Sequence, residues 1–357
     1  DTLALSNAAT VVDADFTLIT GLEKINSGNN NLTLTLGSAS SAAGLTTVTG
    51  GTGTNSITVG AGHTAALSVS LVAGTDTVTA TNYTGALTVS MDVDSLAGDT
   101  LTGGAGTSDK LSLTLDGAGD TALASADMDT VTLFETVDIA SNVAASITSD
   151  TLQIATGGSL AWTASGATTA AVTLVLSDEA DTTSSQTVTL GGTGAHIVTL
   201  GSGSDTYTST STGVDTVTAT AGANTISTGA GADAITLGTG VDNVTAGAGN
   251  DTVTVATANL VSTDTIAGGD GTDTLALSNA ATVVDADFTL VTGVEKINSG
   301  NNNLTLTLGS ASSAAGIATV TGGTGTNSIT IGAGHTAATT VALVAGTDTV
   351  AATNYTG

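Results

Sequence analysis

The chain has 357 residues, of which 31 are acidic and 3 are basic, so its formal net charge is −28 at neutral pH. This balance excludes a nucleic-acid-binding surface, because contacts to phosphate require a basic face. Cysteine is absent and aromatic residues make up 2% of the chain, which excludes disulfides, thiolate metal sites and a conventional aromatic core. No run of about 18 apolar residues occurs, so no transmembrane segment is predicted.

Short strands are predicted along the whole chain. Polar and apolar residues alternate at residues 31–36, 56–59 and 252–255, which is typical of half-buried strands. The 47 glycines favour tight turns, and the absence of proline leaves strand stacking uninterrupted. Because Asn-Gly hairpin pairs are absent, each strand is expected to pair in parallel with the strand one coil away. The predicted fold is therefore all-β: a parallel β-solenoid, of the β-roll or β-helix kind, with tandem repeats.

Repetition extends to long segments. Residues 1–85 recur at 273–357 with nine differences, so the chain holds one period of 272 residues and the start of the next. Such near-identity indicates a tandem array, and the first residues resemble the middle of a strand, so we expect a piece of a longer polypeptide. The sequence divides into four modules: a β-solenoid module A at 1–108, a β-rich module B at 109–190, a nonapeptide β-roll at 191–272, and the start of the next repeat at 273–357.

An Asp, Asn or His recurs at nearly every ninth residue between residues 191 and 254. These residues are His196, Asp205, Asp215, Asn224, Asp233, Asp242 and Asp251. Each lies in a frame of the form small-Gly-small-Gly-x-Asp-x-apolar-x, of which 228–236 and 246–254 are clean copies. Alternate nonapeptides should lie on one side of a coil, so Asp233 is expected to stack between Asp215 and Asp251. Stacked carboxylates repel unless a cation lies between them, and calcium accepts such oxygen ligands.

The frame resembles the nonapeptide of RTX calcium-binding proteins, and the wider pattern resembles bacterial surface-layer and giant adhesin proteins. The resemblance implies two nonapeptides per right-handed coil, with calcium between coils. Asn224 can offer a carbonyl oxygen, whereas His196 is a poor ligand for a hard cation. The ligands implied by position are Asp205, Asp215, Asn224, Asp233, Asp242 and Asp251, together with Asp109, Asp270 and Asp273 in outlying copies of the frame.

The implied function is structural: a calcium-stabilised segment of a large extracellular bacterial surface or matrix protein, exported by a type I secretion system. The expected partners are calcium and other copies of the chain, arranged end to end or laterally. A nucleophile elbow, a His-Glu-x-x-His motif and a phosphate loop are absent, so catalysis is not expected. Two alternatives remain open: an ice-binding, Thr-rich solenoid, and the accessory RTX region of a secreted enzyme.

Several residues outside the nonapeptides receive simpler interpretations. His63 and His335 occupy equivalent Gly-Ala-Gly-His segments and are expected in exposed turns. Trp162, the single tryptophan, is expected to fill a packing gap. Turn-capping is the expected role of four aspartates in Asp-Thr-apolar contexts: Asp76, Asp99, Asp129 and Asp264.

Overall fold

The computed structural model describes residues 1–115, 122–123, 125–140, 142, 144–148, 159–165, 169–176 and 183–357. These residues divide into two units, 1–179 and 180–357, which we treat separately. The prediction of an all-β, parallel β-solenoid is confirmed, because the strands of the described residues pair in parallel with strands one coil away. In the parts of the chain that the structure describes, helical structure is confined to short segments of three to six residues.

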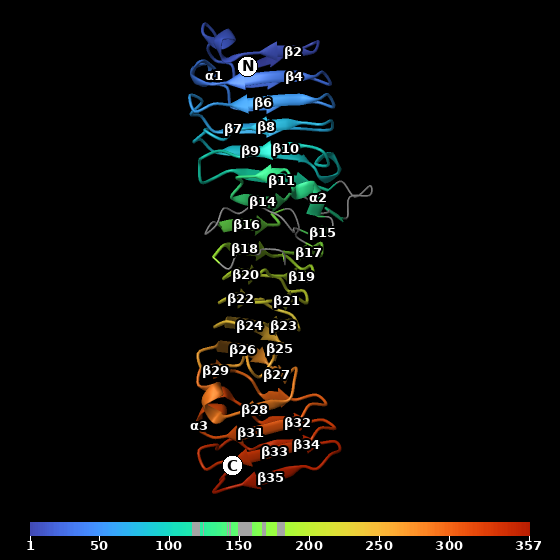
Figure 1. Cartoon of the computed structure of the whole chain (residues 1–357), viewed down its shortest axis with the longest axis vertical. Coiled ribbons are helices and arrows are strands. Elements are labelled where there is room, and N and C mark those ends of the chain that lie inside the picture. Colours follow the sequence, from blue (N-terminus) through green and yellow to red (C-terminus); the bar gives the residue numbers. More distant parts are fainter. Residues whose placement is uncertain are drawn as a thin grey trace. The chain divides into compact units, whose positions relative to one another are not determined.

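Unit 1 is built from walls of parallel strands (Figure 1). The first wall contains β1 (Thr2–Ala4), β3 (Lys24–Asn26), β5 (Thr47–Thr49), β7 (Leu67–Ser70), β9 (Leu87–Asp92), β11 (Lys110–Thr114), β14 (Thr136–Ile139) and β16 (Ser159–Thr163). The second wall contains β2 (Ala9–Val11), β4 (Leu32–Leu36), β6 (Asn55–Val59), β8 (Thr77–Thr79), β10 (Thr100–Thr102) and β13 (Val131–Thr132). A third wall begins with β12 (Ala122–Leu123), β15 (Ala145–Thr148) and β17 (Val172–Val175).

Short helices lie in the connections of unit 1. They are the 3₁₀ turns η1 (Asp13–Phe16) and η2 (Val93–Ser95) and the α-helices α1 (Ser38–Ala43) and α2 (Ser125–Met128). None of the helices in the described parts of the chain is long and apolar enough to cross a membrane.

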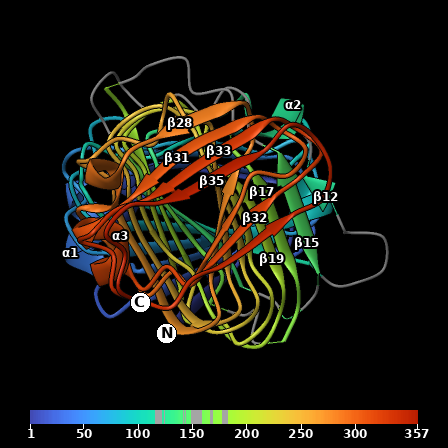
Figure 2. The same cartoon turned by 90° about the horizontal axis from the view of Figure 1, so that it is seen from below.

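Unit 2 repeats the same plan. Its first wall contains β18 (Ser185–Leu190), β20 (Thr206–Ser209), β22 (Thr225–Ser227), β24 (Asn243–Gly249), β26 (Thr265–Gly271) and β29 (Val291–Thr292). The second contains β19 (His196–Thr199), β21 (Thr216–Thr218), β23 (Ala234–Leu237), β25 (Thr252–Val255), β27 (Thr274–Leu277), β30 (Lys296–Asn298), β32 (Thr319–Gly322) and β34 (Thr340–Leu343). The third contains β28 (Ala281–Val283), β31 (Leu304–Leu308), β33 (Asn327–Ile331) and β35 (Thr349–Ala352), with η3 (Asp285–Phe288) and α3 (Ser310–Ala315) in the connections. In Figure 2, β31, β33 and β35 lie side by side as one wall.

Alternation of side chains explains why these strands stack. In β4, Leu32, Leu34 and Leu36 are buried while Thr33 and Thr35 are exposed. Leu34 and Leu36 pair in register with the buried Ile57 and Val59 of the next coil, so each coil covers the apolar row of the next. Trp162 is buried in the same interior and packs there, as its sequence context suggests.

Coil length differs between the nonapeptide region and the rest. Thr216 pairs with Ala234, which pairs with Thr252, so each of these coils contains 18 residues, or two nonapeptides. In unit 1, Lys24 pairs with Thr47, 23 residues along the chain. The extra residues of the longer coils form the connections that carry η1 and α1.

The expectation of exposed turns at His63 and His335 is wrong, since both rings are fully buried. The reason is a contact across one coil: Nδ1 of His63 lies 3.3 Å from Oγ of Ser40, and Nδ1 of His335 lies 3.1 Å from Oγ of Ser312. Both serines belong to short helices, α1 and α3, that cover the histidines. Burial lowers the pKa of His63.

Candidate metal centre

Two ladders of hydrogen bonds run along unit 2, and in each the backbone N–H of one rung donates to the side chain of the next. The first ladder consists of His196, Asp215, Asp233, Asp251, Asp273 and Glu295. The donor–acceptor distance is 2.7 Å from Asp215 to Oδ1 of Asp233, and 2.8 Å from Asp233 to Oδ1 of Asp251. Asp233 therefore stacks between its two neighbours, as the spacing of 18 residues predicts.

The second ladder follows the other turn of the same coils. It consists of Gln186, Asp205, Asn224, Asp242 and Asp264. The backbone N–H of Asp205 lies 3.0 Å from Oδ1 of Asn224, and that of Asn224 lies 3.0 Å from Oδ1 of Asp242. The alternation of the nonapeptides between the two turns thus places every predicted residue from 205 to 251 on one ladder or the other.

Three aspartates of the first ladder each have one buried carboxylate oxygen without a hydrogen-bond partner. Asp233, Asp251 and Asp273 are 2%, 1% and 2% exposed, and the Oδ2 atom of each is unpaired. Burial raises the pKa of Asp233 and Asp273, and it raises the pKa of Asp251 to about 6. A buried carboxylate with an unpaired oxygen is strongly destabilising unless a cation or a proton neutralises it.

Glycine turns surround these carboxylates. Gly229 and Gly231 adopt φ values of +92° and +140°, and Gly247 and Gly249 adopt +102° and +146°, so the turn conformation repeats from coil to coil. A Cβ atom on Gly249 would lie 1.5 Å from the carbonyl oxygen of Gly231. The turns therefore direct carbonyl oxygens at the neighbouring coil in a space that only glycine leaves open.

These groups fit a hard cation. Within the described residues, no three Asp, Glu, His or Cys side chains gather around one point. A bound ion would therefore combine an aspartate oxygen with backbone carbonyls, and calcium accepts six to eight such oxygens. The unpaired Oδ2 atoms and the glycine carbonyl oxygens are oxygen ligands of this kind.

Comparison with known protein families agrees with this chemistry. Residues 209–244, 236–255 and 262–278 match the family model of the RTX calcium-binding nonapeptide repeat (4 copies). This segment is an array of RTX repeats. No curated protein and no solved structure matches the chain. We refer to residues 209–278 as the RTX block.

Two predicted ligands carry protein donors on both carboxylate oxygens. Asp215 lies in the first ladder, but the Tyr207 hydroxyl donates to its Oδ2 over 3.0 Å, while the backbone N–H of His196 contacts its Oδ1. Asp109 of unit 1 accepts the N–H of Leu87 on Oδ1 at 2.8 Å and that of Gly104 on Oδ2 at 2.6 Å. Neither aspartate has the unpaired oxygen that distinguishes Asp233.

The other predicted residues fall into two groups. Asp205 is buried with an unpaired Oδ2, like Asp233, and Asp242 is buried and accepts two bonds from Asn224. Asp270 is exposed in β26 and belongs to neither ladder. Its role as a ligand therefore stays a prediction that the ladders do not support.

Three aspartates interpreted as isolated turn caps also serve as rungs. The backbone N–H of Asn55 donates to Oδ1 of Asp76 over 2.7 Å, and that of Asp76 donates to Oδ1 of Asp99 over 2.6 Å. Asp264 accepts the N–H of Asp242 on Oδ1 over 3.1 Å, and it also caps its own turn as predicted, because its Oδ2 accepts the N–H of Val261 over 2.9 Å. The spacings of 21 to 23 residues in these coils hide the pattern that the 18-residue coils make obvious. Asp129 is exposed, which is compatible with a turn.

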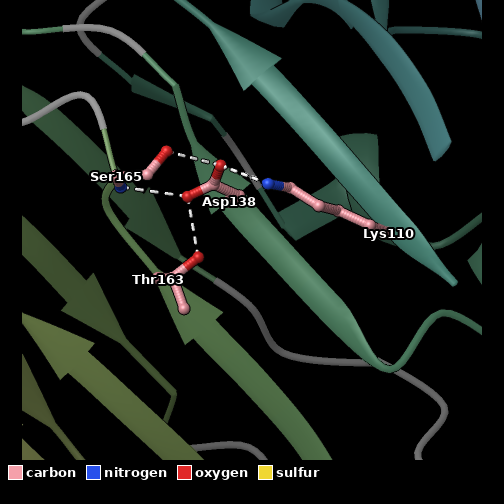
Figure 3. A network of polar contacts seen from close by, with 4 residues as sticks. All are labelled: Lys110, Asp138, Thr163 and Ser165. Carbon is pink, nitrogen blue, oxygen red and sulfur yellow. Dashed lines mark hydrogen bonds and ion pairs between the residues drawn. The ribbon is translucent and has the colours of Figure 1, made fainter. Parts of the chain in front are cut away.

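Asp138 is a buried carboxylate of unit 1 that sequence reasoning did not single out. Figure 3 shows its partners: Nζ of Lys110 at 2.7 Å, the hydroxyls of Thr163 and Ser165 at 2.7 Å each, and the backbone N–H of Ser165 at 3.0 Å. Burial acts to raise the pKa of Asp138, but Lys110 and the other donors outweigh it and lower the pKa. A lysine thus neutralises the buried carboxylate of Asp138, whereas the RTX block contains no lysine.

Proposed function

We propose that the chain is a structural, calcium-stabilised repeat segment of a large extracellular bacterial surface or matrix protein. Such a segment would act as a spacer or fibre in a surface layer, an adhesin stalk or a biofilm matrix. The observation that carries the proposal is the row of unpaired, buried Oδ2 atoms at Asp233, Asp251 and Asp273 inside RTX repeats. We infer that these aspartates, with Asp205, are the principal ligands.

Folding would be coupled to calcium. Calcium would supply positive charge between consecutive coils. The chain itself supplies little, since it has 3 basic residues against 31 acidic ones. The chain's own residues prepare the place: the ladder bonds fix each carboxylate, and the glycine turns bring carbonyl oxygens of adjacent coils together. In a compartment poor in calcium, repulsion among buried carboxylates would oppose closure of the coils.

Calcium removal tests the proposal. Circular dichroism of the full chain in millimolar calcium should show β structure and a high melting temperature, and thorough chelation should remove much of both. Magnesium at equal concentration serves as a control, because its smaller ion demands near-ideal octahedral geometry. An unchanged spectrum and melting temperature after chelation would refute the proposed role of calcium.

The proposed location is outside the cell, after export by a type I secretion system. RTX repeats are typical of secreted proteins, and a calcium-dependent fold suits a chain that crosses the membrane before it closes. We also propose that the segment is not catalytic and associates with further copies of itself, end to end or laterally. The 272-residue tandem period favours a repetitive scaffold over the accessory region of a secreted enzyme.

Ice binding is a second candidate, favoured by one observation. In the second wall of unit 1 a row of hydroxyl side chains on consecutive coils consists of Thr33, Ser56, Thr77 and Thr100, and a parallel row consists of Thr35, Thr58, Thr79 and Thr102. Consecutive hydroxyls within each row lie one coil apart, about 4.8 Å. A thermal hysteresis assay distinguishes the two functions, since a purely structural spacer would show none.

A further inference from the structure

Asparagine occupies three buried positions where the ladders would otherwise carry aspartate: Asn55, Asn224 and Asn327. All three direct Nδ2 toward the carbonyl oxygen of the glycine two residues earlier. The distances are 2.7 Å from Asn55 to Gly53, 3.1 Å from Asn224 to Gly222, and 3.0 Å from Asn327 to Gly325. The amide nitrogen therefore donates into the glycine turn of its own coil.

The same nitrogen also reaches the carboxylate of the next coil. Its distance to Oδ1 of the next rung is 3.0 Å at Asp76, 3.2 Å at Asp242 and 2.9 Å at Asp348. At Asn224 it meets one more carbonyl oxygen, that of Ala221, at 3.1 Å. Each amide nitrogen thus lies among oxygens contributed by two consecutive coils, which is the environment that a cation between coils would need.

An aspartate at such a rung presents an oxygen where asparagine presents an N–H. When the second carboxylate oxygen of an aspartate is surrounded only by carbonyl and carboxylate oxygens, no neighbouring group can donate a hydrogen bond to it. This accounts for the unpaired Oδ2 atoms of Asp233 and Asp251. Asparagine removes one negative charge and supplies two donors at the same volume. The amide and a cation are therefore alternative ways to satisfy one cluster of oxygens.

We propose that Asn55, Asn224 and Asn327 substitute for the cation, so that the choice of Asn or Asp at each rung decides whether that coil needs calcium. The inference rests on the proposed calcium-stabilised function and concerns the regulation of the same ladders. Each ladder then contains two kinds of rung. Coils joined at an asparagine stay paired at any calcium concentration, whereas coils joined at an aspartate with an unpaired oxygen pair only when calcium is bound.

Two aspartate rungs follow the same principle with other donors. The Tyr207 hydroxyl donates to Oδ2 of Asp215, and the backbone N–H of Gly104 donates to Oδ2 of Asp109. Wherever a protein donor occupies the second oxygen, the requirement for a cation disappears.

Exchange of single rungs in the full chain tests the inference. N224D should create a calcium-dependent rung, and D233N should create a calcium-independent one. N250D is the matched control for the first variant, because Asn250 is exposed and its Oδ1 accepts the N–H of Thr272 at 2.9 Å, a bond that aspartate retains. D270N is the control for the second, because it removes one charge at an exposed position beside the ladder.

In chelator, the melting temperature of N224D should lie about 3–6 °C below that of N250D, and that of D233N should lie about 3–6 °C above that of D270N. In calcium, calorimetric titration with the metal alone should show one more ion for N224D than for N250D, and fewer for D233N than for D270N. Equal melting of each pair in chelator would overturn the inference. Failure of the wild-type chain to bind calcium would refute the proposed function, and the chelator comparison would still decide the role of asparagine.

Discussion

Asp233 and Asp251 of the RTX block and Asp76 and Asp109 of unit 1 are all buried, yet their carboxylate oxygens have different neighbours. In the RTX block, Asp233 and Asp251 accept one backbone N–H each and leave Oδ2 unpaired. In unit 1, Asp76 accepts two donors from Asn55, and Asp109 accepts a backbone N–H on each oxygen. Burial alone therefore does not separate the two regions: a carboxylate oxygen without a partner beside paired glycine turns distinguishes Asp233 and Asp251, the ligands that we propose.

Asp99 marks the limit of this contrast. Its Oδ2 is unpaired, as in the RTX block, but the residues before it form η2 and a turn closed by a bond of 3.0 Å from its own N–H to the carbonyl of Leu96. This turn lacks the paired glycines of residues 229–231. Without those carbonyls, the buried, unpaired carboxylate of Asp99 is expected to bind a proton rather than calcium.

The largest effect is expected from filling a glycine turn of the RTX block. Gly249→Ala places Cβ 1.5 Å from the carbonyl oxygen of Gly231 at a φ of +146°, so we expect a loss of roughly 3 kcal/mol or more, measured by urea unfolding in calcium. Gly98→Ala is the control from unit 1, because Gly98 has a φ of +91° with open space around it. That variant should lose about 1 kcal/mol. Equal losses would mean that the carbonyls do not approach the next coil closely.

Removal of single ladder carboxylates should separate the two regions by metal stoichiometry. Asp233→Ala should reduce the number of calcium ions bound in isothermal titration calorimetry. Asp76→Ala should leave that number unchanged, although it leaves two donors of Asn55 unpaired and costs about 2 kcal/mol of stability. The same reduction in both variants would show that the unpaired oxygens are not the distinguishing feature.

Asp99 should control part of the pH dependence of the calcium-free chain. Burial, reinforced by the charge of Asp76, raises the pKa of Asp99 from 3.8 to about 6. The folded state therefore binds the proton more tightly than the unfolded state, and stability falls as the pH rises from about 4 to about 6. Asp99→Asn should remove this fall and add roughly 1–3 kcal/mol at pH 7.

Urea unfolding of calcium-free protein at pH 4.5 and pH 7 measures this difference. Subtracting the Asp99→Asn curve from that of the wild type isolates Asp99 from other aspartates with raised pKa values, such as Asp251. A wild-type chain that becomes more stable between these pH values, relative to the variant, would contradict the assignment.

The smallest effect is expected at Asp138, the one buried carboxylate with a lysine partner among the described residues. Lys110→Met removes the ion pair with Asp138, whose hydroxyl and backbone donors remain, so the loss should be about 1 kcal/mol. The loss should be the same with and without calcium. Lys24→Met is the control, because no ion pair of Lys24 is found among the described residues. A loss that depends on calcium would connect Asp138 to the ladders.

The sequence was sufficient to predict the parallel solenoid and the stacking of Asp215, Asp233 and Asp251, because coils of equal length keep an exact 18-residue spacing. It did not reveal the rungs Asp76 and Asp99, because the spacings there are 21 and 23 residues and do not repeat one period. Variation in coil length thus decides which rungs a linear pattern can identify.

Other features depend on contacts that no spacing encodes. The burial of His63 requires the helix that carries Ser40, one coil away. The hydroxyl of Tyr207, which lies in β20 of the first wall eight residues earlier in the chain, donates a hydrogen bond to Oδ2 of Asp215. The spacing predicts Asn224 as an oxygen ligand, but it does not reveal that the nitrogen of its side chain donates to the turn carbonyls of Ala221 and Gly222. Such roles follow from three-dimensional hydrogen bonding rather than from residue type.

Hydrogen–deuterium exchange of the full chain, with and without calcium, tests the central contrast most directly. The ladder N–H groups of Asp215, Asp233 and Asp251 report on the RTX block, and those of Asn55 and Asp76 report on unit 1. On calcium removal, we predict that exchange in residues 215–273 accelerates at least about tenfold while exchange in residues 55–102 changes much less. Equal acceleration in both regions, or none in the RTX block, would contradict the account.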